Sequence, residues 1–128
     1  MNSRIIRSLI ISSALLTACV SNLSAAEAPK EDKAFFDKLI TAIMKADYES
    51  FVEDGVGSLK QMTKEQFDAA VTQLAPRLNS GYQVTYLGAI KRRTGQLTLW
   101  RIVFTGVDDE ALATLNVKDG KVTTFTIR

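Results

Sequence analysis

The chain has 128 residues, a formal net charge of +2, one cysteine and no histidine. The absence of histidine excludes Ser–His and Cys–His catalysis and His-ligated metal sites. The two surplus positive charges, Arg4 and Arg7, lie near the amino terminus, so the rest of the chain is neutral and has no basic stripe for nucleic acid.

Residues 1–26 are typical of an export signal. Two arginines precede an apolar run over 8–20 that is too short and too rich in serine for a membrane-spanning helix. Two cleavage sites fit this segment. Residues 16–19 resemble a bacterial lipobox, which would make Cys19 a lipidated anchor, and the small residues 24–26 would instead leave Glu27 first. We therefore expect a periplasmic or secreted protein, or an envelope-anchored one if Cys19 is lipidated.

Residues 27–33 are polar, contain Pro29 and predict a tether before a single domain over 34–128. A helix should follow, because its apolar residues recur at the spacing of one helical face. These residues are Phe36, Leu39, Ile40, Ile43 and Met44.

Two further helices are predicted from their capping residues. Asp47 is a typical N-cap for a short helix over 48–53. A loop is expected over 55–62, because it contains two glycines. Thr63 and Gln66 have the spacing of a capping box, so a third helix should begin near Lys64 and end before Gly81.

The last third of the chain, 82–128, reads as four short strands. Trp100, Ile102 and Phe104 alternate with other residues at the period of a half-buried strand. Asp119-Gly120 supplies the positive φ angles of a tight hairpin. The predicted fold class is therefore α+β, with three amino-terminal helices packed on a curved four-stranded antiparallel sheet.

This order of elements resembles the nuclear transport factor two-like superfamily, as does the stretch over 45–51, Lys-Ala-Asp-Tyr-Glu-Ser-Phe. The resemblance implies a cone in which the helices lean on a bent sheet around a pocket, as in cystatin-like folds. Some relatives, of the ketosteroid-isomerase type, perform acid–base chemistry in that pocket, whereas others bind ligands or partners. The fold alone does not choose between these functions.

The strands offer no base for such chemistry. Proton abstraction beside a carbonyl needs a buried carboxylate, and none of the predicted inner-face residues on the strands is acidic. We therefore expect a non-enzymatic binding or interaction module without cofactor, metal or catalytic residues, for a small ligand or an envelope protein. The alternative is a ketosteroid-isomerase-type enzyme. The candidate pocket residues are Tyr82, Tyr86, Trp100, Phe104 and Phe125.

Two charged runs allow a ligand interpretation, but a simpler one explains each. Residues 108–110, Asp-Asp-Glu, lack the alternating spacing of a calcium loop and are expected in a turn. Residues 91–93, Lys-Arg-Arg, could bind an anionic lipid head group or polysaccharide, although charges at a hairpin tip usually keep an edge soluble.

The outer face of the sheet is predicted to be apolar. Leu97, Leu99 and Val103 would face away from the helices, with Leu112 and Val122 beside them. Such a patch usually marks a contact surface, so a homodimer through this face is expected. The alternative is a monomer whose outer face is partly shielded by threonine side chains.

Overall fold

The computed structural model describes residues 27–128. The helices are α2 (Lys30–Lys45), α3 (Tyr48–Val52), α4 (Gly57–Gln61) and α5 (Lys64–Asn79), and the strands are β1 (Tyr82–Arg92), β2 (Gly95–Phe104), β3 (Glu110–Lys118) and β4 (Lys121–Ile127). The predicted signal peptide and Cys19 lie outside the described residues. Among those that are described, no helix has the length and apolar character needed to cross a membrane.

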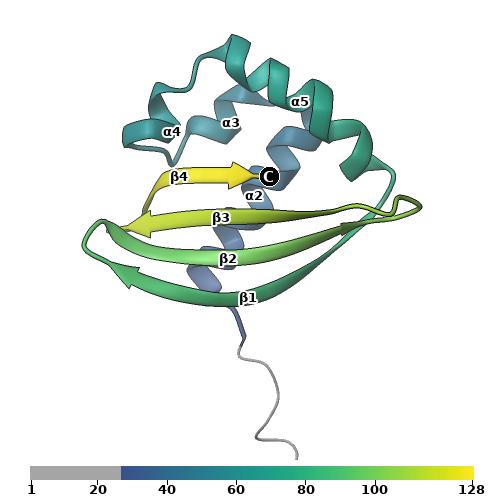
Figure 1. The fold of residues 1–128 in the computed structure, drawn as a ribbon. Helices are drawn as coiled ribbons and strands as arrows, with labels where there is room; N and C mark the ends of the chain where they lie inside the picture. The colour runs from purple at the N-terminus through teal and green to yellow at the C-terminus, as the bar shows by residue number, and fades with distance from the viewer. Residues whose placement is uncertain (1–26) are drawn as a thin grey trace, which may run out of the picture.

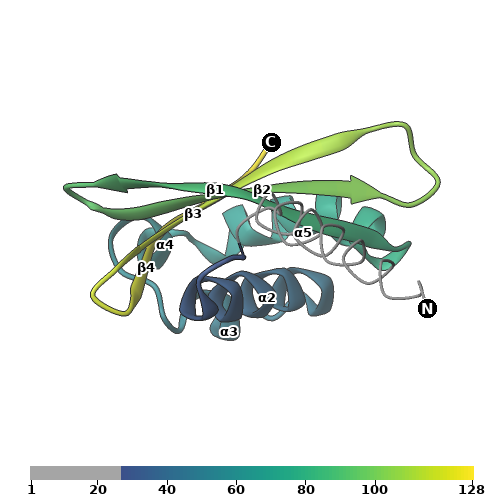
Figure 2. The same cartoon turned by 90° about the horizontal axis from the view of Figure 1, so that it is seen from below.

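The four strands form one antiparallel sheet in the order β1-β2-β3-β4 (Figure 1). All described helices cover one face of this curved sheet, which we call the inner face, and the opposite, outer face carries none of them (Figure 2). The predicted fold class is confirmed, but the described residues contain four helices rather than three.

The predicted caps are present. The Asp47 side chain accepts a hydrogen bond from the backbone N–H of Ser50 and so begins α3. Thr63 and Gln66 form the reciprocal hydrogen bonds of a capping box at the start of α5. Both motifs satisfy N–H groups that a helix start would otherwise leave unpaired.

Two boundaries differ from the prediction. Helix α2 begins at Lys30, so the tether predicted over 27–33 is too long. Part of the loop predicted over 55–62 is the short helix α4. This helix has no side-chain cap, and its Leu59 is 2% exposed within the core. Packing of Leu59 therefore stabilises α4, although the sequence of this segment has only a weak preference for helix.

The core lies between the helices and the inner face. Trp100, Ile102 and Phe104 of β2 are buried there, as predicted. Val122 is also buried, so its predicted place on the outer face is wrong. A bulge in the pairing of β3 with β4, between Asn116 and Val117, shifts the register. One extra residue in a strand turns the next side chain to the opposite face.

Candidate functional site

The inner face carries an aromatic cluster where α2 crosses the sheet. The Phe36 and Trp100 rings are stacked, with their centroids 4.4 Å apart. Tyr86 of β1 meets Trp100 edge-on at 5.1 Å. The indole N–H of Trp100 donates to the hydroxyl of Thr98 at 2.9 Å, and that hydroxyl donates to the carbonyl of Leu115. These contacts fix the orientation of the indole ring.

A hollow of about 730 Å³ opens beside this cluster, between the amino-terminal half of α2 and β1. We call it the aromatic hollow. Its volume lies in the range of about 300–1,000 Å³ that is usual for small-molecule sites. The apolar lining consists of Ala28, Ala34, Phe36, Val84, Tyr86 and Trp100.

The charged residues of the aromatic hollow lie on the chain before α2 and on α2 itself. They are Glu27, Lys30, Lys33 and Asp37. The Lys33 ammonium donates to the Asp37 carboxylate at 2.7 Å, and both side chains are well exposed. The hollow therefore has an aromatic floor and a solvated rim of mixed charge.

Of the five predicted pocket residues, the structure places Tyr86 and Trp100 in the lining of the aromatic hollow. Phe104 is buried under the guanidinium of Arg77, which lies 4.3 Å from the ring centroid. Phe125 is buried against Phe36. Tyr82 is half-buried, packs against the core and pairs with Phe104 across the β1–β2 ladder.

One buried carboxylate was missed by the sequence analysis. Asp32 lies in the first turn of α2, is 5% exposed, and its Oδ2 has no hydrogen-bond partner among residues 27–128. Burial away from water raises the pKa of Asp32, and the neighbouring Glu31 raises it further. A hydrogen bond with the Gln96 side chain lowers the pKa of Asp32, but by less than burial raises it.

The signal for this burial was present in the sequence. Asp32 precedes Phe36 and Ile40 at intervals of four residues, so it extends the buried stripe of α2 by one turn. Asp32 does not line the aromatic hollow.

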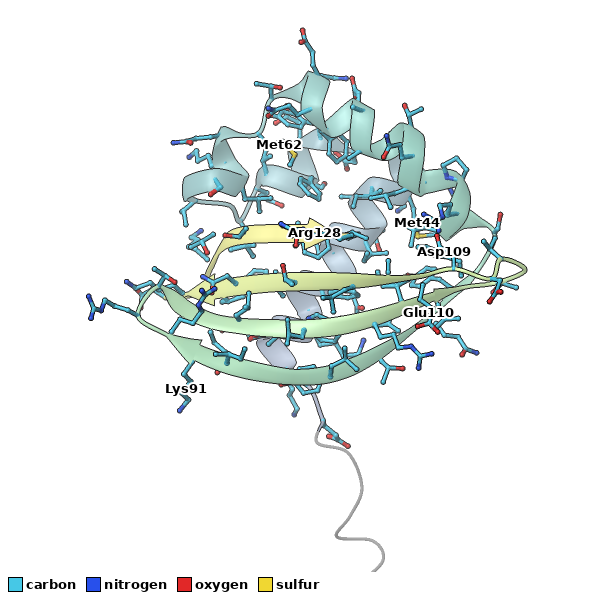
Figure 3. The ribbon with its side chains drawn as sticks, viewed as in Figure 1. Met44, Met62, Lys91, Asp109, Glu110 and Arg128 are labelled. Atoms are coloured by element: carbon cyan, nitrogen blue, oxygen red, sulfur yellow. The ribbon has the colours of Figure 1, made fainter. Side chains whose placement is uncertain are left out.

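Two of the three acids in the run over 108–110 form ion pairs. Asp109 pairs with Arg77 of α5. Glu110 pairs with Arg101, whose Nε donates to Oε2 at 2.9 Å. Both acids lie at one end of the sheet (Figure 3). Within residues 27–128 no group of three potential metal ligands is close enough to hold an ion.

The predicted contact residues Leu97, Leu99 and Val103 are half-buried on β2, in the positions that alternate with the inner-face residues. Leu112 of β3 is 44% exposed. Arg101, which lies among them, is paired within its own chain. A homodimer through this face stays a prediction.

No protein-family model matches the sequence, and no curated protein matches it significantly. Among solved structures, the chain is similar to an NTF2-like protein of unknown function from Cytophaga hutchinsonii, with a TM-score of 0.41 and 8% identity over 80% of this chain and 93% of that one. It is also similar to an uncharacterized cystatin fold protein from Novosphingobium aromaticivorans, with a TM-score of 0.41 and 12% identity over 79% of this chain and 99% of that one. The α+β fold is assigned from the described elements themselves.

Proposed function

We propose that this protein is an exported, non-enzymatic binding module that holds a small apolar or aromatic molecule in the aromatic hollow. The observation that carries the proposal is the pairing of a fixed aromatic floor, formed by Phe36, Trp100 and Tyr86, with an open volume of about 730 Å³. Phe36 and Trp100 are 1% and 2% exposed and hold Tyr86 in place, so the half-buried Tyr86 is the ring of this floor that keeps surface for contact with a ligand.

The charges around the hollow favour binding over proton transfer. Its lining carboxylates, Glu27 and Asp37, are exposed, and Asp37 is neutralised by Lys33. Both lie on the solvated rim, whereas a base that abstracts a proton beside a carbonyl must lie within hydrogen-bond reach of that proton in the bound substrate.

A second candidate function, acid–base catalysis of the ketosteroid-isomerase type, is favoured by Asp32. Its burial and its unpartnered Oδ2 are the features of a carboxylate prepared to exchange a proton. Asp32 does not line the aromatic hollow, so a substrate held there would not touch it. We therefore rank catalysis below binding.

The proposal can be tested through Trp100, the single tryptophan of the chain. A neutral aromatic dye that accepts tryptophan emission, N-phenyl-1-naphthylamine, should quench Trp100 saturably. Replacing Tyr86 with serine removes one ring from the aromatic floor. It should lower the affinity for the dye about fivefold or more. The matched control is Leu87→Ser on the same strand, since Leu87 is 52% exposed and does not line the hollow.

Equal dye affinity in the Tyr86 and Leu87 variants would refute binding in this hollow, as would quenching that does not saturate in the wild-type protein. Loss of affinity in the Tyr86 variant alone, with an unchanged melting temperature, would support it.

A further inference from the structure

A second hollow, of about 680 Å³, lies on the outer face of the sheet. It follows β3 and β4 between the tip of the β1–β2 hairpin and the start of α4. We call it the outer hollow. It shares no lining residue with the aromatic hollow and plays no part in the function proposed above.

The ionisable side chains that line the outer hollow are all cationic. They belong to Arg92, Lys118 and Arg128, and no aspartate or glutamate lines it. None of the three forms a side-chain ion pair within residues 27–128. Asp119, in the turn beside Lys118, is outside the lining. Because the chain after residue 26 carries as many acids as bases, this is a local excess of positive charge.

The cations are spread along the hollow rather than gathered at one point. Arg128 exchanges two backbone hydrogen bonds with Leu112, and Lys118 lies six residues further along β3. At about 3.3 Å per residue this separates the two positions by roughly 20 Å. Arg92 lies near Lys118, because Arg92 pairs with Gly95, and a Cβ on Gly95 would lie 3.0 Å from the Cβ of Lys118. A single phosphate could not contact both ends, whereas an extended ligand with repeated charges could.

Hydroxyl groups line the hollow between the cations. Those of Thr114, Thr124 and Thr126 come from the outward positions of β3 and β4. The hydroxyls of Thr114 and Thr126 share one hydrogen bond with each other, which leaves each of them further acceptor capacity and leaves one O–H free to donate. Such hydroxyls suit a ligand that itself carries hydroxyls. Leu97 and Leu112 add apolar walls on which the C–H face of a sugar ring can pack.

Asn116 supplies an unpaired acceptor in the same lining. It is 5% exposed, and its amide nitrogen donates to the Thr94 carbonyl at 2.8 Å and to the Thr123 hydroxyl at 2.6 Å. Because a carbonyl only accepts, the amide cannot be turned over without losing that bond. Its Oδ1 is buried and has no partner among residues 27–128. A buried acceptor of this kind gains from a ligand donor.

We propose that the outer hollow binds a linear acidic oligosaccharide, a sugar chain that carries carboxylates at intervals. The cations pair with its carboxylates, the threonines exchange hydrogen bonds with its hydroxyls, the Asn116 Oδ1 accepts from one of them, and the two leucines contact its ring faces.

The test is calorimetric titration of the purified protein with oligogalacturonate, and with a neutral maltooligosaccharide of equal length. The lining variant is Arg92→Gln/Lys118→Gln/Arg128→Gln. The matched control is Lys91→Gln/Arg93→Gln/Lys121→Gln, which removes the same charge from residues outside the lining. Lys91 extends from the far edge of the sheet, whereas Arg128 lies at the end of β4 (Figure 3). Melting temperatures of both variants report whether the fold is kept.

We expect oligogalacturonate to bind and the maltooligosaccharide not to bind. The lining variant should lose about tenfold or more in affinity, and the control about twofold or less. Thr124→Val/Thr126→Val should lower the affinity for oligogalacturonate but not the affinity for polyglutamate, since polyglutamate carries the charges without the hydroxyls. Equal losses in the two charge variants would overturn the proposal. So would polyglutamate binding as tightly as the sugar, or no binding by the wild-type protein.

Discussion

Phe36 and Trp100 stack with 21° between their ring planes, and this contact joins α2 to the middle of the sheet. Both rings are almost fully buried, at 1% and 2% exposure. Phe125 meets Phe36 edge-on from β4. The same aromatic pair therefore holds the helix on the sheet and forms the floor of the aromatic hollow, so its removal should affect both stability and binding.

We predict that Trp100→Ala lowers the free energy of unfolding by about 3–5 kcal/mol, because it leaves a cavity under α2 and removes the stacking partner of Phe36. Urea denaturation followed by circular dichroism measures this loss. Trp100→Phe is the control, since it keeps a ring against Phe36 but loses the hydrogen bond to Thr98. An alanine variant about as stable as the wild type would show that this pair does not anchor the helix.

A second prediction concerns Gly95, where the β1–β2 hairpin meets β3. An added Cβ would lie 2.4 Å from the carbonyl oxygen of Val117, and φ is +123°. Gly95→Ala should therefore cost more stability than Gly106→Ala, where φ is also positive but no atom lies within 4 Å of the added carbon. Thermal melts of the two variants compare the costs. Equal costs would mean that the hairpin can move away from β3.

A third prediction follows from the buried carboxylate. Burial raises the pKa of Asp32 above its ordinary value of 3.8. The folded state then holds the proton of Asp32 more tightly than the unfolded state does. The stability that the protonated carboxyl contributes is therefore full below pH 3.8 and is lost as the pH rises through the raised pKa. Asp32→Asn should therefore stabilise the protein at neutral pH and make little difference below pH 3.8.

Urea denaturation at the two pH values measures this dependence. Glu31→Gln should act in the same direction but more weakly, because Glu31 is a smaller cause of the raised pKa than burial. Destabilisation by Asp32→Asn at neutral pH would contradict the prediction and would mean that the hydrogen bond with Gln96 stabilises the ionised carboxylate by more than burial destabilises it.

A fourth prediction is that the protein without a bound oligosaccharide forms a homodimer through Leu97, Leu99 and Val103. Leu97 also lines the outer hollow, so a second copy and a sugar chain would compete for this face. Light scattering should give a dimer mass for the wild type and a monomer mass for Leu99→Glu, because a charge buried at a contact is costly. Thr72→Glu on the exposed side of α5 is the control and should stay dimeric. A wild-type monomer, or a dimer that survives Leu99→Glu, would contradict this surface.

Features set by neighbours in the sequence could be predicted. The caps at Asp47 and Thr63 depend on a residue three positions further on, so spacing alone identifies them. The inner face of β2 followed from alternation, because Trp100 and its neighbours two residues away must share a side.

Features set by distant contacts could not. Val122 turns inward because of a bulge against β3, and α4 exists because Leu59 reaches the core. The outer hollow joins the β1–β2 hairpin, β3, β4 and α4, which are separated along the chain. The sequence showed Arg92 in a basic run but not that Lys118 and Arg128 share its surface.

Native mass spectrometry of the protein purified from its own cells tests the binding function most directly. We predict a bound small molecule that is retained by Leu87→Ser and lost from Tyr86→Ser, since Tyr86 lines the aromatic hollow and Leu87 does not. Wild-type protein that carries no bound molecule, or a molecule equally retained by both variants, would contradict the proposal.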